Sequence, residues 1–309
     1  MITTRVERMR WPPCPVQRMP WFWLPSKATN FGDDYNLDLG AALLHRAPLR
    51  TYSPSSSYSS GLWMTSDREV SPKVVACGSV LPVVRKGDVV AGPGGYAMQR
   101  GINFDALRDP NTTIASVRGP DTASLLRNHS VDHSDFLPNI DPGLLAGTLV
   151  WPHLRNKPQR GSTGASEKPR RVCLIPHGSD VAFERHARRF WTDIHILSVH
   201  QRASKMAIAM GECNLILSTS LHGLVFADAF QIPSIWIHSK GTSQKPFKFN
   251  DYFASLGHPR NHWAPSIKAA LDIPQQYTRP VLSDVVFEDL ARHYLESFPF
   301  SRVCGKEVE

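Results

Sequence analysis

Apolar and polar positions alternate in a regular order through the second half of the chain. Short apolar runs rich in Val, Ile and Leu predict strands, and segments with apolar residues three or four positions apart predict helices. These patterns predict strands at residues 171–176, 194–199, 213–219 and 233–238, with helices between them at 179–191, 201–210 and 220–230. Strands that alternate with helices indicate a parallel sheet covered by helices on both faces.

The first half repeats this pattern less regularly. Its apolar runs predict strands at residues 21–24, 73–78, 88–92 and 113–119, and helices at 35–46 and 120–127. A further helix is expected at 283–298, where apolar residues recur at helical spacing. The fold class that follows is α/β, because strands and helices alternate along most of the chain.

A basic, polar stretch at residues 153–171 separates the two halves. It is rich in Gly, Ser and Pro and has almost no large apolar side chain, which is typical of an exposed linker. A second polar stretch at 51–61 is expected to be a loop within the first half. We predict an N-terminal lobe at 1–152, a linker at 153–170 and a C-terminal lobe at 171–309. Two such lobes form a cleft, and loops at the carboxyl ends of their strands are where ligands bind.

The charge of the chain narrows the class of partner. The 309 residues have a formal net charge of +8, and a basic surface of this kind attracts nucleic acid, anionic lipid headgroups or phosphorylated metabolites. Nucleic acid is the weakest of these options. The sequence has no zinc-finger spacing, no RNA-recognition signature and no dense block of Lys and Arg with interleaved aromatic residues.

The cysteines and the absence of long apolar runs suggest a compartment. No uninterrupted run of about 18 apolar residues predicts a transmembrane helix, and the basic N-terminus does not resemble a signal peptide. The five cysteines are scattered and show no C-x-x-C spacing, which argues against a structural zinc site and against a disulfide framework. We therefore expect a reducing compartment and place the protein in the cytoplasm. The inner face of the cytoplasmic membrane, or the Golgi if the source is eukaryotic, are the alternatives.

One apolar stretch, STSLHGLVFADAFQIPSIWI at residues 218–237, contains a histidine directly after a run of hydroxyl side chains. The predicted strand ends there and a helix begins, so His222 falls in the first helical turn, near unpaired backbone N–H groups. The positive end of the helix dipole should lower the pKa of His222, and a neutral imidazole can act as a base near pH 7. The same N–H groups can hold a phosphate or a carboxylate. The alternative is a partly buried histidine that only hydrogen-bonds its own turn.

A second candidate site follows the first predicted strand, in the sequence NFGDDYNLDLG at residues 30–40. Asp33 and Asp34 are explained equally well as acidic residues in the first turn of a helix, where they favour the helix dipole. Asn30 and Gly32 suggest a backbone that stays close to another group.

Basic side chains stand at other predicted strand ends. Arg118 follows a strand and precedes a helix, so it is either a surface arginine or a clamp for an anion. His177 lies at a strand end in the second half. Lys248 lies among aromatic residues at 245–257. The alternative to a binding role is that this segment is an amphipathic helix whose lysines are solvated.

Eight motifs occur in a fixed order along most of the chain: NFGDDYN from Asn30, GSV from Gly78, GDVVAG from Gly87, VRGPDTASLL from Val117, DPGLL from Asp141, IPHGSD from Ile175, the stretch from Ser218 described above, and KFNDYFASLG from Lys248. The Ser-x-Leu-His-Gly sequence followed by Ala-Asp-Ala and Ile-Pro is the most specific of them. With these motifs the chain resembles the polysaccharide pyruvyl transferase family. The resemblance implies two Rossmann-like lobes similar to GT-B glycosyltransferases. It also implies transfer of a pyruvyl ketal from phosphoenolpyruvate to a sugar of a surface polysaccharide or its precursor.

The resemblance also assigns roles to individual residues. It implies that His222 is the acid/base group that deprotonates a sugar hydroxyl. Some family members have Arg where this chain has Ser220, so we expect Lys248 or Arg85 to supply the missing cation. The predicted donor-binding residues are Arg118, Ser220, Leu221, Gly223 and Lys248. The predicted acceptor or cleft residues are Asn30, Gly32, Asp33, Asp34 and His177.

The implied partners are phosphoenolpyruvate and a sugar or lipid-linked oligosaccharide acceptor, with peripheral association at a membrane surface and no nucleic acid. No metal and no cofactor is expected. Two other functions stay open from the sequence. One is a GT-B glycosyltransferase that uses a nucleotide sugar, although its usual Glu-rich segment for the nucleotide ribose is not evident. The other is a protein that binds an anionic glycan without catalysis, which the absence of Arg at position 220 favours.

Overall fold

The computed structural model contains two five-stranded sheets, and every strand pairing in the described part of the chain is parallel. It describes residues 14, 17, 19–22, 30–45, 50–51, 72–95, 101–131, 139–155, 171–238, 246–257, 263–274 and 282–304. The first sheet contains β1 (Trp21–Phe22), β2 (Arg50–Thr51), β3 (Val74–Val75), β4 (Val89–Ala91) and β5 (Thr113–Ser116). The second contains β6 (Val172–Ile175), β7 (His195–Ile196), β8 (Leu215–Ser218), β9 (Ser234–Ile237) and β10 (Trp263–Ala264).

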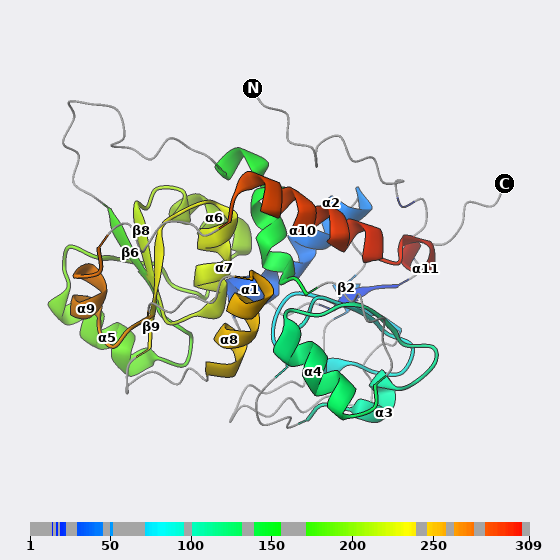
Figure 1. Ribbon diagram of the computed structural model, residues 1–309. Helices are drawn as coiled ribbons and strands as arrows, with labels where there is room; N and C mark the ends of the chain where they lie inside the picture. Colours follow the sequence, from blue (N-terminus) through cyan, green and yellow to red (C-terminus); the bar gives the residue numbers. More distant parts are fainter. Residues whose placement is uncertain are drawn as a thin grey trace.

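Helices connect most of the strands. They are α1 (Phe31–Asp34), α2 (Asn36–Leu44), α3 (Phe104–Leu107), α4 (Pro120–Asn128), α5 (Val181–Phe190), α6 (Ala203–Met210), α7 (Leu221–Ala229), α8 (Pro246–Ser255), α9 (Ile267–Leu271), α10 (Asp284–Ser297) and α11 (Phe300–Cys304). Short 3-10 helices are η2 (Leu81–Val83), η3 (Pro142–Gly147) and η4 (Pro152–Leu154). Figure 1 shows α5 and α9 on one side of the second sheet and α6 and α7 on the other. The predicted fold class, two Rossmann-like α/β lobes with parallel sheets, is confirmed.

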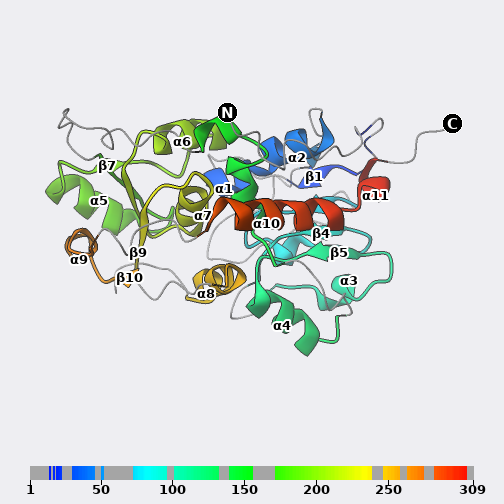
Figure 2. The same cartoon turned by 45° about the horizontal axis from the view of Figure 1, so that its top comes forward.

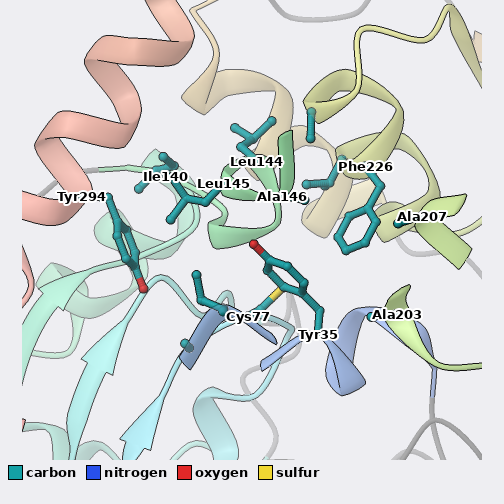
Figure 3. Packing of buried hydrophobic residues seen from close by; sticks show 14 of the residues in the cluster. Tyr35, Cys77, Ile140, Leu144, Leu145, Ala146, Ala203, Ala207, Phe226 and Tyr294 are labelled. Carbon is teal, nitrogen blue, oxygen red and sulfur yellow. The ribbon is translucent and has the colours of Figure 1, made fainter. Parts of the chain in front are cut away.

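Helix α7 is the centre of the molecule. All nine of its residues are buried, so it has no polar face, as expected for a helix surrounded by protein. The Phe226 ring contacts the rings of Phe31 and Tyr35, with centroids 5.0 and 5.1 Å away. Residues from both halves of the chain join this core (Figure 3). Burial on all sides explains why the sequence from Ser218 onward is so apolar.

The C-terminal helices extend across to the first sheet. The Tyr294 hydroxyl on α10 donates a hydrogen bond to the Ala91 carbonyl of β4 at 3.0 Å, and Arg302 on α11 donates to the Gly87 carbonyl at 2.7 Å. Figure 2 shows α10 running across the molecule towards β1 and α11. The predicted lobe boundaries stay a prediction, since most of the linker, residues 156–170, lies outside the described residues, as do residues 52–61 of the expected loop.

Two disulfides correct the expectation drawn from the cysteines. Cys14 pairs with Cys304 and Cys173 pairs with Cys213, while Cys77 is buried as a free thiol. The scattered positions misled because the fold brings distant segments together: Cys14 and Cys304 are 290 positions apart in sequence. Disulfides persist mainly in oxidising compartments, so the cysteines give no support to a reducing one. Among the helices that the structure describes, none has the length and apolar character that crossing a membrane requires.

Candidate active site

The strand order of the two sheets indicates where a ligand should bind. In chain order the first sheet is arranged 2-1-3-4-5, and the second repeats this order with β6 as its first strand. Such a doubly wound sheet has a switch point between its strands 1 and 3, and ligands bind at the carboxyl ends of those strands. The switch points here lie between β1 and β3 and between β6 and β8. Asn30 and Cys77 lie after the first pair, and His177 and His222 after the second.

The two switch points meet at His222. Its Nδ1 lies 3.2 Å from Asn30 Oδ1, which links the first turn of α7 to the N-cap of α1. The Gly32 backbone packs directly against the imidazole ring, since a Cβ added at Gly32 would lie 2.0 Å from Nδ1. Any other residue at position 32 would therefore displace the histidine.

The tautomer of His222 follows from these contacts. Asn30 Oδ1 also accepts hydrogen bonds from the backbone N–H groups of Gly32, at 2.8 Å, and Asp33, at 3.3 Å, so it is an acceptor. Nδ1 of His222 must therefore be the protonated nitrogen that donates to it. Nε2 keeps its lone pair and lies 3.6 Å from Cys77 Sγ.

His222 is neutral near pH 7. Burial is the main cause that lowers its pKa, to about 3, and the nearby charges of Lys248, Arg118 and His177 lower it further. The sequence reasoning gave the correct direction from the helix dipole, but burial has the larger effect. A neutral imidazole with an unprotonated Nε2 can accept a proton.

Lys248 joins this group from α8. The side chain is half-buried, and burial together with the charge of Arg118 lowers its pKa to about 7, against the opposing effect of Asp180 and Asp33. Lys248 is also a cause of the low pKa of His177, about 3, where burial is again the larger effect. The lysine is therefore close to both histidines and half charged near neutral pH, which suits reversible binding of an anion.

Arg118 is fully buried, so it is not a surface arginine. Its Nε donates to Asp251 Oδ2 at 3.0 Å and its Nη1 to Ser79 Oγ at 2.9 Å. Asp251 also accepts from the backbone N–H and the hydroxyl of Thr122, at 2.9 and 2.6 Å. Helix α8 is thereby attached to the start of α4 by one buried carboxylate. The same helix holds Lys248 one turn earlier.

The acidic pair after β1 is divided between two roles. Asp33 accepts a hydrogen bond from Asn30 Nδ2 at 2.6 Å and acts on the pKa of Lys248, so it belongs to the group around His222. Asp34 instead accepts from Arg202 Nε at 3.0 Å and from the Ala203 backbone N–H at 2.9 Å. These bonds attach α1 to the start of α6, which makes Asp34 a contact between the two halves of the chain.

The side chains next to His222 at the start of α7 make contacts within the protein, and their predicted role in donor binding stays a prediction. Ser220 is the N-cap but its side chain makes no capping bond, and Ser218 Oγ accepts from the Ser220 backbone N–H at 3.0 Å. Gly223 lets α7 approach β8, since a Cβ there would lie 2.3 Å from Ser218 Oγ. Leu221 packs in the core. Arg85 donates to the carbonyls of its own loop and is not among the causes of the pKa shifts of Lys248 or His222.

Sequence reasoning missed several residues of this region. Cys77 is the second-last residue of the strand predicted at 73–78, so its position near a strand end was a usable signal. Asp141, Asp180 and Asp251 lie within the motifs DPGLL, IPHGSD and KFNDYFASLG, but no role was assigned to them. The role of Asp251 depends on a partner 133 positions away, which no local pattern reports.

Comparison with known proteins gives three findings. The family model described as "Polysaccharide pyruvyl transferase" matches residues 105–240. The succinoglycan biosynthesis protein ExoV of Rhizobium meliloti (strain 1021) is 26% identical over 253 residues, which cover 77% of this chain and 65% of that protein. An uncharacterized protein of Acanthamoeba polyphaga mimivirus is 25% identical over 242 residues, which cover 77% of this chain and 74% of that protein. No solved structure matches the chain.

Proposed function

We propose that the chain is a member of the polysaccharide pyruvyl transferase family, whose model matches residues 105–240, and that it moves a pyruvyl group from phosphoenolpyruvate to a sugar of a polysaccharide or its precursor. The observation that carries this proposal is a neutral histidine, His222, held with Nε2 unprotonated beside the cationic side chains of Lys248 and Arg118. A base next to cations is the combination that an anionic donor and a hydroxyl acceptor need.

The donor has a carboxylate and a phosphate, and both need positive partners. Lys248 is the side chain best placed to meet the donor, since it is half-buried whereas Arg118 is fully buried and paired with Asp251. The first N–H groups of α7 add donors of fixed direction. In this assignment Lys248 replaces the arginine that some family members have at the position of Ser220.

The chemistry adds two hydroxyl groups of the sugar to one carbon. His222 Nε2 accepts the proton of the first hydroxyl as its oxygen bonds to C2 of the donor. The terminal enol carbon takes up one proton from solvent, and His222 returns its own proton to solvent, so that the two protons balance. The second hydroxyl then bonds to C2 while the bond from C2 to the phosphate oxygen breaks, and its proton leaves with the phosphate. The products are the ketal and inorganic phosphate, so no oxidant and no cofactor is consumed.

The test is release of phosphate from phosphoenolpyruvate in the presence of a panel of oligosaccharides, with mass spectrometry of the sugars. The expected result is phosphate release that depends on the acceptor, with a mass gain of about 70 Da, that of pyruvate less one water. Release of UDP from a nucleotide sugar would instead identify a glycosyltransferase. Binding of an anionic glycan without any consumption of phosphoenolpyruvate would identify a binding protein.

Lys248 predicts how the reaction depends on pH. Its protonated form binds the anion, so kcat/KM for phosphoenolpyruvate should be highest below the pKa of about 7 and fall as pH rises through it. For a required ammonium group the expected fall is about fivefold between pH 7 and pH 8.

The matched control for this pH profile is Lys248→Arg, because a guanidinium stays charged over the whole range. The alkaline fall should disappear in this variant, while ionisation of the donor itself affects both proteins equally. If Lys248→Arg keeps the same fall, another group titrates and Lys248 does not bind the donor.

The cellular location of the protein and its peripheral association with a membrane are also proposals. A lipid-linked oligosaccharide acceptor would place the protein at a membrane surface, where the excess of basic side chains favours anionic headgroups. The two disulfides favour an oxidising compartment, such as the Golgi alternative, over the predicted cytoplasm.

A further inference from the structure

The side chains of Cys77, Asp141 and His222, which all carry metal-binding atoms, lie close together. Cys77 follows β3, Asp141 is the N-cap of η3 and His222 lies in the first turn of α7. Cys77 Sγ lies 3.6 Å from His222 Nε2 and 3.7 Å from Asp141 Oδ1, and the three ligand atoms all lie within 4.8 Å of one another. All three residues are buried.

The two distances from Cys77 Sγ fit tetrahedral coordination, and the distance between His222 and Asp141 is within 4.8 Å. Zinc binds cysteine sulfur at about 2.3 Å and histidine nitrogen or carboxylate oxygen at about 2.0–2.2 Å. Two ligands at a tetrahedral angle are then about 3.3–3.6 Å apart. The distances from Cys77 Sγ to the other two ligand atoms, 3.6 and 3.7 Å, already match this value to within a few tenths of an ångström.

The ligand atoms are also in the right chemical state. A histidine that binds a metal through one nitrogen commonly donates its other N–H to a carbonyl or carboxylate oxygen. His222 does this through Nδ1 to Asn30 Oδ1, and Asn30 in turn donates to Asp33. Nε2 therefore points its lone pair towards Cys77 and the space between the ligands.

Asp141 gives an independent indication of a ligand. Its Oδ1 accepts from the Gly143 backbone N–H at 2.9 Å, but the fully buried Oδ2 has no hydrogen-bond partner in the described part of the protein. A buried carboxylate oxygen without a partner is costly and calls for an explanation. Coordination of a cation supplies one.

We propose that Cys77, Asp141 and His222 bind a divalent transition-metal ion, with Zn²⁺ as the best fit, and that this ion blocks pyruvyl transfer. On binding, the Cys77 thiol releases its proton to solvent and a sulfur–metal bond forms. The thiolate and the carboxylate then neutralise the two charges of the ion within a buried site. Three protein ligands leave the fourth position open. Inhibition follows because the metal occupies the lone pair of His222 Nε2, and this part of the inference depends on the proposed function.

Binding is tested with Co²⁺, which replaces Zn²⁺ and gives thiolate-to-metal charge-transfer absorption in the near ultraviolet. Cys77 is the only cysteine outside the two disulfides, so with the disulfides intact this absorption can arise from Cys77 alone. We expect one ion per chain in equilibrium dialysis, loss of the absorption in Cys77→Ser, and affinity at least about tenfold weaker in Asp141→Asn.

The control for unspecific binding is His195→Ala, because His195 is an exposed histidine on β7. It should bind Co²⁺ like the parent. Absence of the absorption in the folded parent, or unchanged affinity in both Cys77→Ser and Asp141→Asn, would overturn the metal site. Circular dichroism of each variant shows whether it is folded, and the conservative changes to Ser and Asn keep the size of the side chains.

Inhibition is tested separately. Zn²⁺ should abolish acceptor-dependent phosphate release in the parent, a chelator should restore it, and any turnover that remains in Cys77→Ser should resist Zn²⁺. Metal binding without inhibition would overturn the inhibitory role of the ion, while the metal site itself would stand. If no acceptor supports turnover at all, the proposed function fails, while the absorption and dialysis results still decide whether the site exists.

Discussion

His222→Ala should lower pyruvyl transfer by about a hundredfold to ten-thousandfold, the usual contribution of a positioned general base. The fold should survive, because the polar contacts of the imidazole are one hydrogen bond to Asn30 and one weak contact to Cys77. The measurement is kcat for acceptor-dependent phosphate release, together with the melting temperature of both proteins. His195→Ala, in an exposed position on β7, is the matched control and should keep full activity.

The dependence of kcat on pH tests whether the general base has the low pKa of His222. Burial lowers the pKa of His222 to about 3, so the imidazole can act as a base at any pH above that value. We expect kcat to fall only as the pH approaches 3, where the imidazole becomes protonated. A base of ordinary pKa would instead cause a loss of kcat near pH 6.5. A folded His222→Ala protein with parental kcat would show that the proton goes elsewhere.

Arg118→Ala should destabilise the protein by about 3–5 kcal/mol, since it leaves the Asp251 carboxylate buried without its cation. The stability of a typical domain is only about 5–15 kcal/mol, so the loss should be evident in urea or thermal unfolding. Affinity for phosphoenolpyruvate should fall as well, because α8 loses its attachment and Lys248 lies one turn from Asp251.

Asp251→Asn distinguishes the two roles of Arg118. This variant removes the charge of the partner and one of its two acceptor oxygens, so it can accept from only one of the Thr122 backbone N–H and Arg118 Nε. It should therefore perturb α8 while Arg118 remains. A parental donor affinity in Asp251→Asn, with a large loss in Arg118→Ala, would show that Arg118 contacts the donor itself. Equal losses in both would show that Arg118 acts by positioning α8. Parental stability and donor affinity in Arg118→Ala would exclude both roles.

Local patterns of apolar residues predicted the helices and strands well in two cases. One is an element with a single buried face, and the other is a short element that is buried on all sides. The strand expected at 213–219 is β8 at Leu215–Ser218, and the helix expected at 220–230 is α7 at Leu221–Ala229. The helix expected at 283–298 is α10 at Asp284–Ser297. Their periodicity records which face is buried, and that information is local. The position of His222 in the first turn of α7 follows from it.

The sequence by itself therefore determined the parallel α/β class, the place of His222 at a strand end and the motifs by which the chain resembles the polysaccharide pyruvyl transferase family. The tertiary structure alone decided which distant side chains share a site. The charge of Asp33 raises the pKa of Lys248 while its neighbour Asp34 binds Arg202, and Cys77 meets Asp141 and His222. It also paired Cys14 with Cys304. Periodicity reports the environment of each residue but not the identity of its neighbours, and these contacts depend on neighbours that the strand order and the packing of α7 and α8 bring together.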